Sequence, residues 1–126
     1  MEFDQVPNHD EVLSRFIFSS SHFTRSRVKP DAFLPTKDLE TSMFRGTGLD
    51  RRGIRQAGDV VGLLTNRTMK AWGDVHAGQV FAVGLGLRPD NVPERHAAII
   101  GWPDQKDEQL SLAQCLAEVA TLFVPS

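Results

Sequence analysis

Residues 97–122 read AAIIGWPDQKDEQLSLAQCLAEVATL and hold the two clearest elements of the chain. The apolar run Ala97–Ile100 has the length of a buried strand, and Pro93 and Pro103 bracket it. The stretch that follows predicts an amphipathic helix over about 105–122, with an apolar face made of Leu110, Ala113, Ala117, Ala120 and Phe123. A strand followed by a helix of this kind indicates a layered structure of sheet and helices.

Upstream, the N-terminal half predicts two further helices and one short strand. Val12, Leu13, Phe16 and Ile17 share one helical face, which predicts a helix over about 9–19. Thr41–Arg45 is typical of a short strand. Asp50 is expected to cap a middle helix with Ile54, Ala57, Val61 and Leu64 on its inner face, and a break near Gly58 is the alternative.

The remaining segments complete a single α+β domain. Strand pairing is expected over 72–87 with a bulge at Gly78, residues 22–38 form an irregular segment, and residues 1–8 are a flexible leader. The predicted fold is a short, mostly antiparallel sheet packed by an N-terminal helix, a middle helix and a C-terminal amphipathic helix.

Composition excludes several classes of protein. The single cysteine among 126 residues excludes an internal disulfide and a cysteine-rich zinc site. Four histidines provide no recognisable metal-ligand spacing, so neither a metal nor a cofactor is expected. No apolar run approaches the roughly 20 residues of a membrane span, and the acidic start lacks a signal-peptide core. We therefore expect a cytoplasmic protein.

Charge is distributed unevenly along the chain. The net charge is −2, but residues 25–55 hold eight basic and four acidic side chains, and this region therefore carries +4. Such a basic region is typical of a surface that meets an anionic partner, and an ordinary solvated surface is the alternative. The eight bases are Arg25, Arg27, Lys29, Lys37, Arg45, Arg51, Arg52 and Arg55.

A few polar residues next to apolar segments are the candidate site. His22 and His96 are candidate acid and base groups, and Arg45 is a candidate clamp for an anion. Lys29, Ser42, Arg27 and Trp102 are candidate ligand-binding residues. The alternatives are structural: each histidine satisfies a local partner, Arg45 pairs with Glu40 or Asp50, and Trp102 packs in the core. No nucleophile elbow, metalloprotease helix or phosphate loop is present.

Four segments resemble a family of small bacterial proteins of unknown function. They are Ser21–Phe23, Lys29–Pro35, Glu40–Arg45 and His96–Pro103. The resemblance covers most of the chain and implies no activity, so it assigns no catalytic role to any residue.

Two function hypotheses follow from these residues. The first is a binding or accessory module that engages a protein or an anionic partner, such as a nucleotide or nucleic acid, through the basic region 25–55. The second is a small enzyme acting on a phosphodiester or nucleotide, with His22 and His96 as acid and base and Arg45 as the clamp. Convergence of these three side chains in one pocket would favour the enzyme.

Overall fold

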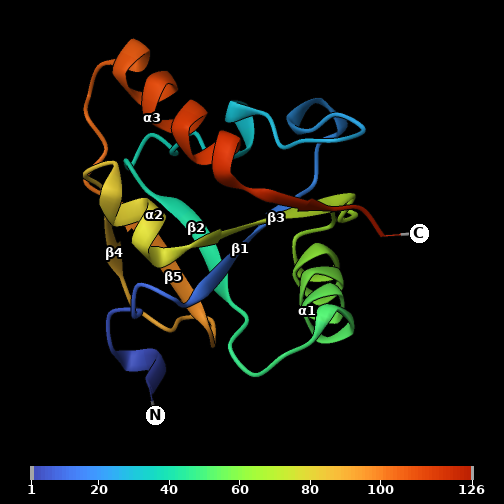
Figure 1. Cartoon of the computed structure of the whole chain (residues 1–126). Coiled ribbons are helices and arrows are strands. Elements are labelled where there is room, and N and C mark those ends of the chain that lie inside the picture. Colours follow the sequence, from blue (N-terminus) through green and yellow to red (C-terminus); the bar gives the residue numbers. More distant parts are fainter. Residues whose placement is uncertain (1, 126) are drawn as a thin grey trace.

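A computed structural model describes residues 2–125 as one six-stranded antiparallel sheet with helices on both faces (Figure 1). The strands are β1 (Val12–Ile17), β2 (Thr41–Arg45), β3 (Ala71–His76), β4 (Gly86–Arg88), β5 (His96–Ile100) and β6 (Thr121–Phe123). The helices are α1 (Arg51–Leu64), α2 (Ala77–Ala82) and α3 (Lys106–Val119), with 3-10 turns η1 (Glu2–Asp4), η2 (Ser20–His22) and η3 (Pro30–Ala32). The strand order is β4-β5-β2-β1-β3-β6. The α+β class and the antiparallel sheet are thereby confirmed.

The two faces of the sheet are covered very differently. Side chains alternate across β1, so Leu13 and Ile17 point to one face and Ser14 and Phe16 to the other. The first face carries the main core, in which Leu13 and Ile17 are fully buried together with residues of α2, α3 and η3. Figure 1 shows α3 and α1 on opposite sides of the sheet. On the α1 side the buried cluster is small, with Ile54, Met69 and Trp72 at its centre.

The helix predicted over 9–19 is wrong, because this stretch forms the strand β1. The strand lies between β2 and β3, and apolar side chains cover it on both faces. A strand with apolar side chains on both faces loses the alternation of apolar and polar residues that would identify it. Its β-branched and aromatic composition, Val12 with Phe16 and Ile17, was the better guide.

Two other segments depart from the prediction. Residues 77–82 form α2 and not a continued strand with a bulge at Gly78, because Gln79 Oε1 accepts a hydrogen bond from the backbone N–H of His76 (2.8 Å) and starts a helical turn. The C-terminal helix ends at Val119, and Phe123 belongs to β6, where it stacks on Trp72 with 5.3 Å between ring centroids. The strands at Thr41–Arg45 and around Ala97–Ile100 are confirmed.

The N-terminal segment is tied to the sheet, although a flexible leader was expected over 1–8. Met1 lies outside the described residues, but Phe3 is buried beneath the guanidinium groups of Arg45 and Arg95. Residues 22–38 are irregular as predicted, with η3 and one bridge between Phe23 and Val28. Within residues 2–125, no helix has the length and hydrophobicity needed to cross a membrane.

Candidate functional site

A groove opens where β1 and β2 separate. These two strands pair only at Leu13 with Arg45 and at Ser14 with Phe44. Beyond that point β1 stays with β3 through Ile17, whereas β2 stays with β5 through Thr41. The two halves of the sheet therefore splay apart, and α1 stands over the gap. A cavity of about 570 Å³ lies between them, a size that is typical of small-molecule sites.

Arg15 reaches across the gap between the two strands. Its Nε donates to the carbonyl oxygen of Ala32 (2.7 Å), and its Nη1 donates to the carbonyl oxygen of Ser42 (3.0 Å). Both acceptors are neutral, and Arg15 forms no ion pair with any carboxylate in residues 2–125. The guanidinium thus lines the cavity as a positive charge held in place by carbonyl groups.

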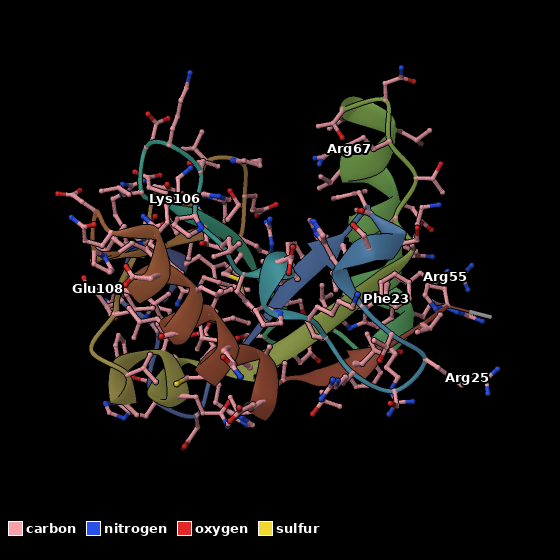
Figure 2. All side chains as sticks on the ribbon, turned by 90° about the horizontal axis from the view of Figure 1, so that it is seen from above. Phe23, Arg25, Arg55, Arg67, Lys106 and Glu108 are labelled. Carbon is pink, nitrogen blue, oxygen red and sulfur yellow. The ribbon has the colours of Figure 1, made fainter. Side chains whose placement is uncertain are left out.

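A second guanidinium faces the same cavity. Arg67 lies 4.0 Å from the centroid of the Phe18 ring and donates from Nε to Thr65 Oγ1 (3.0 Å). Burial, together with repulsion from Arg67, lowers the pKa of Arg15 to about 10. In Figure 2 Arg67 lies beside the C-terminal half of α1, whereas Arg55 lies near its start. Arg15 therefore keeps its positive charge at neutral pH, but burial and Arg67 make that charge less favourable than in water, and a bound anion would relieve this cost.

The glycines of α1 determine which face of the helix lines the groove. Asp50 caps the helix as predicted, with Oδ1 accepting from the backbone N–H of Gly53 (2.9 Å). The helix does not break near Gly58; Gly58 and Gly62 are instead buried toward the sheet and the 65–70 segment. A Cβ at Gly58 would lie 2.1 Å from Met69 Sδ, and a Cβ at Gly62 would lie 2.5 Å from the Arg67 carbonyl oxygen.

This packing corrects the predicted inner face of the helix. Of that face only Ile54 is buried; Ala57, Val61 and Leu64 line the cavity, and Leu64 is 81% exposed. Because the glycines bring the helix backbone close on one side, the neighbouring apolar stripe faces the groove, where Ala57 and Val61 are half-buried and Leu64 is exposed. On the sheet side the groove is lined by the rings of Phe16, Phe18 and Phe44.

A half-buried carboxyl group lies in the sheet below the groove. Ser14 Oγ donates to Asp74 Oδ1 (2.5 Å), and Ser14 also lines the cavity. Burial raises the pKa of the Asp74 carboxyl, and the hydrogen bond from Ser14 partly offsets this effect. The Ser14 hydroxyl group therefore already donates its hydrogen bond to Asp74 within the protein.

Two of the predicted site residues lie in the groove. Ser42, which is exposed, and His96, which is half-buried, both line the cavity. The Nδ1 atom of His96 lies 2.6 Å from Asp90 Oδ1. Burial disfavours the charged form of Asp90, but hydrogen bonds from His96, the Val92 backbone and Arg88 outweigh this effect and lower the pKa of Asp90. One side of the imidazole ring is thus bound to a carboxylate.

Arg45 lies on the other face of the sheet, inside the protein. Phe44 pairs with His96 and shares its face, so the next residue points the opposite way. Arg45 is only 2% exposed and donates two hydrogen bonds to the Glu11 carboxylate, from Nε to Oε2 (2.7 Å) and from Nη2 to Oε1 (2.9 Å). Its Nη1 donates to the carbonyl oxygens of Phe3 (3.0 Å) and Gln5 (2.7 Å). The partner is therefore a distant carboxylate and not Glu40, which pairs with Arg88.

The other candidates lie outside the groove. His22 belongs to η2, and its carbonyl oxygen accepts from the Lys29 backbone, while Arg27 is exposed in the turn closed by Thr24. Trp102 is 5% exposed in the main core, and its Nε1 has no hydrogen-bond partner in the described part of the chain. None of these lines the cavity, so the structure does not bring His22, Arg45 and His96 into a shared pocket.

The basic side chains of region 25–55 lie in several separate places in the fold. Arg45 is withdrawn into the interior, whereas the other arginines of the region are exposed. Arg51, Arg52 and Arg55 surround a smaller hollow of about 280 Å³ at the start of α1, beside Phe123. The guanidinium of Arg51 lies 4.5 Å from the Phe123 ring centroid, and Arg55 approaches Asp59 at 3.9 Å.

The groove residues that sequence reasoning missed are Arg15 and Arg67. Within β1, Arg15 stands between Leu13 and Ile17 on a face that is otherwise apolar, a signal that the helical interpretation hid. Arg67 follows the helix in a polar loop and carries no signal of its own. No group of three or more potential metal ligands is found within residues 2–125. No protein-family profile, no curated protein and no solved structure matches this chain significantly.

Proposed function

We propose that this protein is a binding module that takes an anionic ligand into the groove between α1 and the splayed strands β1 and β2. The observation that carries the proposal is the pair Arg15 and Arg67, two guanidinium groups that line one cavity without a carboxylate partner. Arg67 is exposed, but the guanidinium of Arg15 is largely removed from water and keeps its charge at a cost unless an anion accompanies it. A carboxylate or phosphate meets that need with charge-assisted hydrogen bonds.

The second hypothesis, a phosphodiester or nucleotide enzyme, stays a prediction that no observation favours. An anion clamp must reach the ligand, whereas Arg45 is buried and saturated by Glu11 and two carbonyl groups. His96 alone of the three candidate catalytic groups lines the groove. Within residues 2–125 its imidazole is hydrogen-bonded to Asp90 and not to Ser42 or Glu94, which also line the groove, so the contacts present do not link these groups as a catalytic set.

A matched pair of probes tests the anionic character of the site. Benzoate and benzamide have nearly the same shape, and only benzoate carries a charge. We expect benzoate to shift the backbone amide NMR signals of residues 14–16, 42–44 and 65–67 in the full chain, and benzamide to shift them far less. The pair AMP and adenosine repeats the test for a nucleotide. Equal responses to the charged and uncharged members of both pairs would contradict the proposal.

Two arginine variants locate the charge that matters. Arg67→Gln should weaken benzoate binding about fivefold to tenfold, because it removes one charge-assisted hydrogen bond. Arg52→Gln is the matched control, since it removes the same charge from the other end of α1, outside the groove. Equal weakening by the two variants would mean that benzoate senses only the overall charge of the protein.

A further inference from the structure

The groove is far more apolar than an anion alone requires. Phe16, Phe18 and Phe44 form one wall, and Ala57, Val61 and Leu64 of α1 form the other. A site for a free inorganic anion would present polar groups on several sides. Here the positive groups occupy a small part of the lining, and the rest suits a hydrocarbon body.

The α1 wall remains exposed in the ligand-free protein. Leu64 is 81% exposed and Val60 is 53% exposed, although both line the cavity. Contact between these apolar side chains and water is unfavourable. A hydrocarbon chain lying between the helix and the sheet would cover them and remove that contact. Because Gly58 and Gly62 face the sheet and the 65–70 segment, Val60 and Leu64 stay exposed at the groove.

The charge of the lining limits the charge of the ligand. Arg15 and Arg67 contribute two positive charges, and Glu94 contributes one negative charge. These three side chains sum to one positive charge, so the site is complementary to a single negative charge. A nucleotide or nucleic acid brings several negative charges and too little apolar surface for these walls.

From these three features we infer that the ligand is a single-chain amphiphile with one anionic head group, of the class of medium- and long-chain carboxylates. The head group lies against Arg15 and Arg67, and the chain lies between the phenyl rings of the sheet and the apolar stripe of α1. The inference rests on the proposed anion site and names the class of its ligand.

A chain-length series with butanoate, octanoate and dodecanoate, each below its micelle concentration, tests the inference by calorimetry on the full chain. We expect affinity to rise about threefold to fourfold for each added CH2 group until the groove is filled. Dodecyltrimethylammonium, with the same tail and a positive head, should bind at least tenfold more weakly than dodecanoate. An affinity that does not grow with chain length would overturn the inference.

Neighbouring leucines on α1 supply a matched pair of variants. Leu63 and Leu64 are both 81% exposed, but only Leu64 lines the cavity, so either substitution leaves the folded core intact. Leu64→Asn should weaken dodecanoate binding about fivefold or more, and Leu63→Asn should leave it unchanged. Equal effects would show that the detergent-like ligand binds the exposed helix surface and not the groove.

The results separate this inference from the proposed function. If benzoate or AMP binds through Arg67 but dodecanoate binds no better than butanoate, the anion site stands and the amphiphile is wrong. If dodecanoate and dodecyltrimethylammonium bind equally well, the groove recognises only hydrocarbon, and both the inference and the anionic function fall.

Discussion

An arginine lies at each end of the β1–β2 pair, and the two arginines differ in their burial and in their hydrogen-bond partners. At the closed end Arg45 is 2% exposed and saturated by Glu11 and by carbonyl groups of the N-terminal segment. At the open end Arg15 bridges the gap through neutral carbonyl groups and has no carboxylate partner. The closed end secures the fold, whereas the open end leaves a positive charge available to a ligand.

Removing Arg45 should cause the largest loss of stability. Arg45→Met leaves Glu11 as an unpaired, nearly buried carboxylate, and such a loss costs about 3–5 kcal/mol. Urea unfolding of the variant measures the difference in the free energy of unfolding. Adding Glu11→Gln to Arg45→Met should recover part of the loss, because the uncompensated charge is gone. A loss below about 1 kcal/mol would mean that the pair does not secure the closed end.

The placement of α1 over the open end should be the next most sensitive feature. Gly62→Ala puts a Cβ against the backbone carbonyl of Arg67, which cannot move easily, and overpacking of this kind costs about 1–3 kcal/mol. Gly58→Ala is the comparison, since its Cβ would meet the flexible end of Met69. We expect thermal unfolding to show a larger loss for Gly62→Ala than for Gly58→Ala, and the reverse order would contradict the role assigned to Gly62.

Arg15→Met should cost much less than Arg45→Met. The variant leaves the carbonyl oxygens of Ala32 and Ser42 without this donor, but it also removes a partly buried charge that Arg67 repels. The two effects oppose each other, and we expect a net loss of about 1 kcal/mol in urea unfolding. A loss as large as that of Arg45→Met would show that Arg15 holds the sheet together and is not set aside for a ligand.

The elements that carry local sequence signals were predicted better than those that depend on tertiary contacts. Asp50 and the run Lys106–Val119 carry local signals for a helix cap and an amphipathic helix, and both elements are present. The strand β1 was misread because its residues meet apolar partners on both faces, which only the tertiary structure supplies. Leu64 was expected in the core because its spacing from Ile54 fits a buried face, whereas the glycines decide which side of α1 approaches the sheet.

The candidate site was harder to predict than the fold. Ser42 and His96 were proposed from local sequence, and both line the groove. Arg15 and Arg67 are 52 positions apart in the sequence, and only the splay of β1 from β2 and the turn after α1 bring them to one cavity. The partner of Arg45 is likewise 34 residues away, beyond the reach of any local pattern.

The smallest expected effect concerns Asp74, beneath the open end. Burial raises the pKa of its carboxyl in the folded protein, so the fold favours the protonated form. That contribution is complete below the ordinary aspartate pKa of about 3.9 and is lost as the pH rises through the folded-state pKa. Asp74→Asn cannot ionise and keeps an oxygen that accepts from Ser14. Its melting temperature relative to wild type should therefore rise between pH 3 and pH 7. A constant difference across this range would mean that the Asp74 carboxylate carries no cost of burial, and that the sheet under the groove is better solvated than its packing indicates.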